Sequence, residues 1–226
     1  MTSAGKAGSG YVQRRPAPGR PTQGGRQAAA VIGCVLVMLA AGAAVAAAPA
    51  DPHAHHHAEA SAAVQRSEVD YRTPDVSLVR EDGMRVSLPR ELDDGRPVVM
   101  NFIYTDCTTI CPLSSQVFAQ LQAALGAERD HVHFVSISID PERDTPARLR
   151  AYATKFHAAR EWNHYTGSTA ASLAAQRAYD VYRGDKMSHT PVTLMRAAPG
   201  KPWVRLDGFA TSQDLLAEYR SWHSGS

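Results

Sequence analysis

Residues 97–112 read PVVMNFIYTDCTTICP, an apolar run followed directly by two cysteines and a proline. The run Pro97–Tyr104 is apolar at almost every position, which is typical of a central strand buried on both faces. A helix is expected to follow from near Pro112 to Leu125, because apolar residues recur there at helical spacing. The two cysteines therefore fall at a turn between a central strand and the start of its helix.

The rest of the chain, from Val69 to Trp222, alternates between strand and helix patterns. An Asp82-Gly83 pair between two short strand-like segments predicts a β-hairpin ahead of the central strand. Further strands are expected over residues 131–139, 162–166, 191–195 and 203–206, and further helices over residues 146–156, 170–179 and 212–222. This order predicts an α/β, thioredoxin-like domain with an added N-terminal β-hairpin, occupying residues 70–226.

The composition is that of an ordinary globular protein, since 44% of the 226 residues are hydrophobic and 20% are charged. These values exclude collagen-like, fully disordered and disulfide-dense classes. The charge is uneven: residues 1–48 carry five basic residues and no acidic one, whereas residues 49–226 carry 19 basic and 22 acidic residues. A mildly acidic domain argues against nucleic acid as a partner.

The N-terminal segment has the pattern of a membrane-targeting signal. Residues 28–48 are uncharged and, at about 1.5 Å per residue, long enough to cross a bilayer core of about 30 Å. The basic residues 1–27 predict a cytoplasmic tail, so a single-pass anchor would place the domain on the periplasmic or extracytoplasmic side of the inner (plasma) membrane. Ala46-Ala47-Ala48 also resembles a cleavage site, so a cleaved signal peptide is the alternative. Both interpretations export the domain.

Residues 49–69 are expected to form a linker that contains four clustered histidines, namely His53, His55, His56 and His57. Clustered imidazoles can bind copper, zinc or nickel. They also occur in solvated linkers that bind nothing, because clustering alone fixes no coordination geometry. The sequence leaves both interpretations open.

Cys107 and Cys111 are the only cysteines in the expected domain, and their spacing is C-x-x-x-C. Two thiols four residues apart at a helix start can converge, because residues i and i+4 share one helix face. The helix N-terminus also stabilises a thiolate. Such a pair suits binding of Cu(I), a structural disulfide, or exchange of electrons with another dithiol.

His189 lies in the stretch MSHTP, just before an expected core strand. In a thioredoxin-like fold the proline at that place is typically cis, so a cis peptide bond is expected at Pro191 and would turn His189 toward the cysteines. Two thiolates and one imidazole would make a three-coordinate copper site. Met187 is expected to pack against the core, with a thioether contact to copper as the alternative. Asp140 and Asp144 are expected to organise a loop and to cap the following helix.

Three stretches of the chain together resemble one family. They read FIYTDCTTICP (102–112), VSISIDPERDTP (135–146) and MSHTP (187–191). On these stretches the domain is similar to the Sco/SenC family of copper-binding, thioredoxin-like proteins that assist cytochrome c oxidase assembly. The resemblance implies that Cys107, Cys111 and His189 bind copper. Thr108 stands where many members have proline, and Ser188 precedes the histidine where many members have aspartate.

The resemblance implies a copper metallochaperone that binds Cu(I), Cu(II) or both and delivers copper to a cytochrome c oxidase subunit or another exported copper protein. The alternative is a thiol-disulfide oxidoreductase that keeps a partner's copper-ligand cysteines reduced, with electrons from a thiol reductant. Its reaction would be dithiol–disulfide exchange through Cys107 and Cys111. A peroxidase of the peroxiredoxin type ranks last, because Tyr104 stands where its P-x-x-x-T-x-x-C pattern requires proline.

Overall fold

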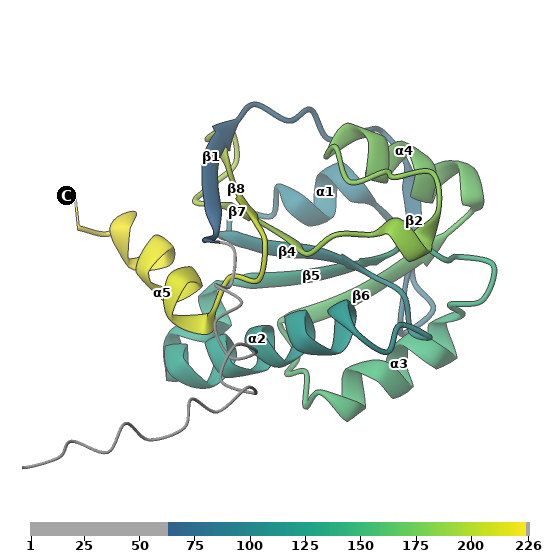
Figure 1. The fold of residues 1–226 in the computed structure, drawn as a ribbon, viewed down its shortest axis with the longest axis horizontal. Coiled ribbons are helices and arrows are strands. Elements are labelled where there is room, and N and C mark those ends of the chain that lie inside the picture. Colours follow the sequence, from purple (N-terminus) through teal and green to yellow (C-terminus); the bar gives the residue numbers. More distant parts are fainter. Residues whose placement is uncertain (1–62, 225–226) are drawn as a thin grey trace, which may run out of the picture. The chain divides into compact units, whose positions relative to one another are not determined.

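A computed structural model describes residues 63–224, which form an eight-stranded sheet with helices on both faces (Figure 1). The expected tail 1–27, the expected anchor 28–48 and the clustered histidines at positions 53, 55, 56 and 57 lie outside the described residues. Within residues 63–224, no helix is both long enough and apolar enough to span a bilayer.

The elements follow the alternation of strand and helix that the sequence predicts. The strands are β1 (Gln65–Val69), β2 (Ser77–Arg80), β3 (Arg85–Ser87), β4 (Val98–Ile103), β5 (His133–Ser138), β6 (Trp162–Gly167), β7 (Val192–Arg196) and β8 (Trp203–Asp207). The helices are α1 (Leu88–Leu92), α2 (Ile110–Leu125), α3 (Pro146–Lys155), α4 (Thr169–Ala178) and α5 (Ser212–Ser221), with short 3-10 helices η1 (Gly126–His131) and η2 (Lys186–Ser188). β1, α1 and the two 3-10 helices were not expected.

The strand order across the sheet is β1-β8-β7-β4-β5-β6-β2-β3. Neighbours among β4, β5 and β6 run parallel, and all other neighbouring pairs run antiparallel. The expected N-terminal hairpin is confirmed, because β2 and β3 pair antiparallel around Gly83, whose φ of 90° suits glycine. The hairpin extends the sheet beyond β6. The β4-α2-β5 unit, the β7–β8 hairpin and the closing helix α5 then give the expected thioredoxin-like arrangement.

β4 lies at the centre of the sheet and is buried on both faces (Figure 1). Val99 and Ile103 pack in the core that α2, α3 and α5 cover. Val98, Met100 and Phe102 pack in the core that α1 and α4 cover. Because both faces are apolar, β4 has the continuous apolar sequence of an interior strand.

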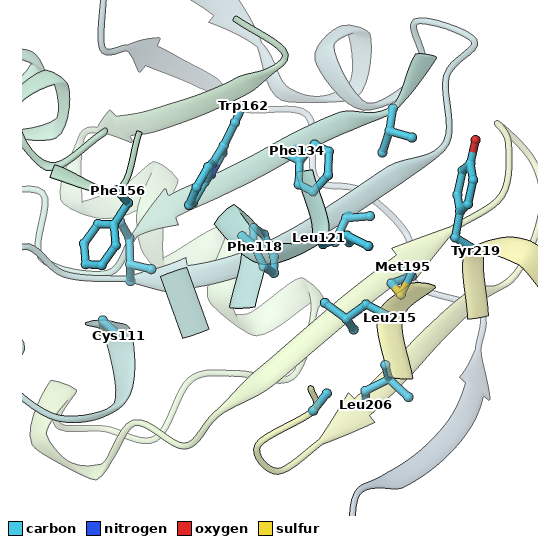
Figure 2. Packing of buried hydrophobic residues seen from close by; sticks show 14 of the residues in the cluster. Cys111, Phe118, Leu121, Phe134, Phe156, Trp162, Met195, Leu206, Leu215 and Tyr219 are labelled. Carbon is cyan, nitrogen blue, oxygen red and sulfur yellow. The ribbon is translucent and has the colours of Figure 1, made fainter. Parts of the chain in front are cut away.

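An aromatic cluster supports the helix that follows β4 (Figure 2). The ring centroids of Phe118 in α2 and Phe134 in β5 are 5.9 Å apart, and those of Phe118 and Trp162 in β6 are 5.5 Å apart. Cys111 is buried in the same hydrophobic core, apart from these three rings. The core therefore holds the first turn of α2, and one cysteine with it, in a fixed position.

α2 begins at Ile110, two residues before the expected start near Pro112. Proline fits in the first turn of a helix, because an N–H group there has no partner within the helix. The earlier start places Cys111 inside the helix, close to its N-terminus.

The start of α3 corrects the expected cap. Thr145, not Asp144, is the N-cap residue, and its Oγ1 accepts the N–H of Arg148 at 3.3 Å. Pro146 follows at the first helical position, as expected. The carboxylate of Asp144 is instead buried and engaged elsewhere, as described below.

β1 occupies the end of the segment expected to be a linker, residues 49–69. It pairs antiparallel with β8 along its whole length. Most of its side chains are exposed, so it lacks the apolar alternation by which a strand is recognised in sequence. The side chain of Arg66 is held by an ion pair of 2.8 Å with Glu218 of α5.

Replacement of Phe118 by alanine should lower the free energy of unfolding by about 3–5 kcal/mol, because a fully buried ring is lost and a cavity remains. The control, Phe209→Ala, removes a ring that is 48% exposed and should cost about 1 kcal/mol or less. Denaturant unfolding followed by circular dichroism measures both. Equal losses in the two variants would contradict the packing in Figure 2.

Candidate metal centre

The two cysteines lie next to each other at the N-terminus of α2. Cys107 is in the loop after β4, where its N–H donates to the carbonyl oxygen of Tyr104 at 3.1 Å. Cys111 is in the first turn of α2, and its N–H donates to Sγ of Cys107 at 3.4 Å. Both thiols are free and buried. The C-x-x-x-C spacing thus brings the two residues into contact.

The two thiols differ in acidity. Burial raises the pKa of Cys107, but hydrogen bonds from the backbone N–H groups of Cys111 and Thr109 outweigh it and lower that pKa to about 7. Burial is the main cause that raises the pKa of Cys111 far above its usual range, and the nearby Cys107 and Asp144 add to the rise. Cys107 is therefore the thiol that ionises near neutral pH.

Tyr104 directly follows β4, and its carbonyl oxygen accepts the N–H of Cys107. Burial and a hydrogen bond with Cys107 raise the pKa of Tyr104 to about 12, so the phenol stays protonated and can donate. The hydroxyl donates to Sδ of Met187 at 3.5 Å. The ammonium group of Lys186 lies 5.6 Å from the centroid of the Tyr104 ring.

Asp144 fastens the cysteine loop to the loop after β5. Its carboxylate is only 1% exposed. One oxygen accepts the hydroxyl of Thr105 at 2.5 Å, and the other accepts the N–H of Thr105 at 3.2 Å and the hydroxyl of Ser138 at 2.6 Å. The expected role of Asp144 in organising a loop is confirmed, and it extends to the loop that carries Cys107.

Asp140, in the loop after β5, contacts the segment that leads to His189. It forms an ion pair with Lys186, the first residue of η2. Oδ1 of Asp185 accepts the N–H of Met187 at 2.9 Å and so caps the same short helix. These contacts fix the backbone just ahead of His189.

His189 is 6% exposed and points at the end of β4. Its Nε2 lies 3.0 Å from the carbonyl oxygen of Phe102, which can only accept, so Nε2 carries the proton. Nδ1 is buried and has no hydrogen-bond partner. Burial lowers the pKa of His189, which keeps the ring neutral at neutral pH. A neutral imidazole with one nitrogen fixed by a carbonyl and the other free is the usual form of a histidine metal ligand.

The peptide bond before Pro191 is trans, which corrects the expected cis bond, and no cis bond occurs anywhere in residues 63–224. The trans isomer of an X–Pro bond is lower in free energy by about 0.5–1 kcal/mol. Although the bond before Pro191 is trans, the hydrogen bond to the carbonyl oxygen of Phe102 holds His189 in place. The imidazole therefore lies against the strand that leads to Cys107.

The structure brings Cys107 and Cys111 together but leaves His189 outside their contact. Among the residues described, no three His, Cys, Asp or Glu side chains are close enough to share a metal ion. A cavity of about 400 Å³ opens beside His189, between the loop after β5, α4 and the segment 181–186. The chemistry of the three groups still fits copper, because two thiolates and one free imidazole nitrogen are ligands that copper prefers.

The sequence pattern did not point to three contacts of this site. Thr105 and Ser138 hold Asp144, and their short polar side chains have no periodicity that would mark them. The carbonyl of Phe102, which orients His189, is a backbone group and leaves no trace in sequence. The contact of Tyr104 with Met187 joins residues 83 positions apart, so only the fold reveals it.

A family model described as SCO1/SenC matches residues 65–223. Among curated proteins, the SCO1 protein homolog of Bacillus subtilis (strain 168) is 33% identical over 103 residues, which are 45% of this chain and 52% of that protein. The chain spans about half or less of the length of several curated relatives.

Solved structures have the same fold. ScoI of Bradyrhizobium japonicum, solved with copper bound, superposes with a TM-score of 0.56 at 26% identity, covering 66% of this chain and 98% of that one. BsSco, described as a member of the Sco family of cytochrome c oxidase assembly proteins with a disulfide switch, gives a TM-score of 0.58 at 25% identity over 71% of this chain and 98% of its own. Because the family model matches residues 65–223, which are nearly the whole described domain, this chain belongs to the SCO1/SenC family.

Proposed function

We propose that this protein is a copper metallochaperone that holds copper through Cys107, Cys111 and His189 and releases it to another copper protein. The observation that carries the proposal is the buried Nδ1 of His189, which has no partner, on the segment that follows η2. Together with the touching thiols it supplies soft sulfur and neutral nitrogen donors. Copper is the cargo of this site.

The order of binding follows from the acidities of the ligands. Among Cys107, Cys111 and His189, the ligand that binds before the other two is Cys107, because its pKa of about 7 makes its thiolate available near neutral pH. Cys111 then loses its proton to become a ligand, so copper uptake releases protons. His189 closes the site after its ring leaves the carbonyl oxygen of Phe102 and Nδ1 turns toward the sulfurs. Release to a partner is the reverse, by stepwise exchange of ligands.

The relatives support a respiratory client. BsSco is described as belonging to the cytochrome c oxidase assembly proteins, and ScoI of Bradyrhizobium japonicum has been solved with copper bound. We infer that the partner is a cytochrome c oxidase subunit or another exported copper protein. Because copper binding needs reduced thiols, a thiol reductant is the second expected partner.

A thiol-disulfide oxidoreductase is the second candidate, and the unequal acidity of the two cysteines favours it. A thiolate at Cys107 attacks a partner disulfide to form a mixed disulfide. Cys111 then attacks that bond, the reduced partner leaves, and Cys107 and Cys111 are left oxidised to a disulfide. The thiol reductant restores them. This reaction does not use His189, which is the residue that separates the two functions.

Copper binding should depend on all three ligands. In the full chain with His53, His55, His56 and His57 changed to alanine, we expect one Cu(I) per reduced molecule. Cys107→Ser or His189→Ala should weaken binding by more than about 100-fold, beyond the 10–100-fold typical of groups that only support a ligand. Competition with a chromophoric Cu(I) chelator measures the affinity.

The matched controls for this titration are Cys34→Ser and His131→Ala, and His131 is an exposed histidine in η1. Both should bind copper as the parent chain does. If copper is lost with the four linker histidines and survives His189→Ala, the domain is a redox protein and the second candidate function replaces the first.

The two thiols should react with iodoacetamide at different pH. The reduced chain should be alkylated at Cys107 with a rate that rises through a midpoint at about pH 7, because only the thiolate reacts. Cys111 should stay unreactive across that range, since burial raises its pKa. Mass spectrometry of peptides resolves the two sites. A midpoint for Cys107 near the ordinary thiol value of about 8.5 would show that the N–H groups do not stabilise the thiolate.

We also propose that residues 28–48 anchor the protein in the inner (plasma) membrane, with the domain outside the cytoplasm. Support comes from the uncharged segment and the basic residues before it. Alkaline phosphatase, which folds only where disulfides form, should be active when fused after Ser226. Introduction of two arginines within residues 31–39 should abolish that activity, and persistence of the activity would exclude the segment as the export signal.

A further inference from the structure

Met187 is the most exposed of the large apolar side chains in the part of the chain that the structure describes, at 73%. The expectation that it packs against the core is therefore wrong. A single exposed apolar residue is common on protein surfaces and by itself indicates nothing. The position of its sulfur is what separates Met187 from an ordinary surface methionine.

The backbone that carries Met187 is fixed on both sides. Asp185 accepts its N–H at 2.9 Å, and Lys186 is paired with Asp140. Two residues further on, His189 is bound to the carbonyl of Phe102. The side chain of Met187 thus projects into solvent from a segment held at three points.

Tyr104 joins Met187 to the loop that carries the thiols. The hydroxyl of Tyr104 lies 3.5 Å from Sδ of Met187, and the carbonyl oxygen of the same residue accepts the N–H of Cys107 at 3.1 Å. Met187 therefore presents an exposed thioether on the residue that leads into the loop of the more reactive cysteine. The contrast is Met84, which is 56% exposed and whose sulfur accepts Nη2 of Arg80 at 3.3 Å, on the β2–β3 hairpin.

We propose that the thioether of Met187 is the first ligand that incoming Cu(I) meets and the last that it leaves, passing the metal to and from the Cys107 thiolate. This inference rests on the proposed copper-chaperone function. A thioether is a soft, neutral ligand that selects Cu(I) and binds it weakly enough to release it. It needs no deprotonation, so it can accept copper at any pH.

The exchange balances without a redox step. A bond between copper and its donor breaks as the Cu–S bond to Met187 forms, and copper stays in the +1 state throughout. The thiolate of Cys107 next displaces the thioether, and the proton released is the one that its thiol held.

The test compares Met187→Leu with the matched control Met84→Leu, because leucine keeps the volume of methionine. Both are made in the full reduced chain that carries alanine at the four linker histidines. Cu(I) is supplied as its bicinchoninate complex, and its transfer is followed by the loss of colour. Met187→Leu should slow loading by about tenfold, the lower end of what supporting ligands contribute. The final stoichiometry and the affinity should be unchanged, and Met84→Leu should load as the parent does.

A second measurement looks for the bond itself. Cys111→Ser removes the second thiolate and should hold copper between Cys107 and Met187. With methionine labelled with ¹³C at the methyl group, one equivalent of Cu(I) should shift the Met187 resonance and leave that of Met84 in place. This readout does not depend on delivery to any partner.

The outcomes separate the two proposals. If the parent binds one copper, Cys107→Ser abolishes binding, and Met187→Leu loads at the parental rate without a methyl shift, the chaperone function stands and the role of Met187 is refuted. If Cys107→Ser and His189→Ala bind copper as the parent does, the chaperone function fails and the role of Met187 falls with it.

Discussion

The buried carboxylate of Asp144 is the contact on which the geometry of the site depends. Three groups donate to it, the N–H and hydroxyl of Thr105 and the hydroxyl of Ser138, and it so joins the loop after β4 to the loop after β5. A buried carboxylate without hydrogen-bond partners is costly in free energy. Separation of the two loops would remove these partners, so the hydrogen bonds hold the loops together. Cys107 follows Thr105 by two residues, so the hydrogen bonds of Asp144 set its position relative to α2.

The chemistry of the cysteine pair comes from backbone groups as much as from the thiols. An N–H at the start of α2 has no partner within the helix, and that of Cys111 is given to the sulfur of Cys107. The same turn buries Cys111 in the hydrophobic core shown in Figure 2. The N–H group lowers the pKa of Cys107, whereas burial raises the pKa of Cys111 and keeps that thiol protonated. This division of roles suits stepwise capture of a metal as well as disulfide exchange.

The elements that sequence analysis predicted are those whose signal is local. β4 is apolar at consecutive positions because both of its faces are buried, and the Asp82-Gly83 turn contains the glycine that a positive φ requires. β1 escaped prediction because pairing with β8 and one ion pair, not an apolar face, hold it in place. The sequence did not show that Thr145, and not Asp144, caps α3, because both residue types are good N-caps. The donors that decide between them are on Thr105, 39 positions from Asp144, and on Ser138.

For the candidate site, the sequence identified the groups but not their spatial relation. Cys107 and Cys111 meet because four residues at a helix start bring them together. His189, by contrast, is 78 residues from Cys111, and its orientation is set by a backbone carbonyl. That carbonyl fixes the tautomer and leaves Nδ1 free, yet it also keeps the ring away from the sulfurs. In the copper site that we propose, this contact orients His189 as the third ligand and also keeps it apart from the thiols. Closure of the proposed site is then a step of its own, separate from capture of copper by the sulfur ligands.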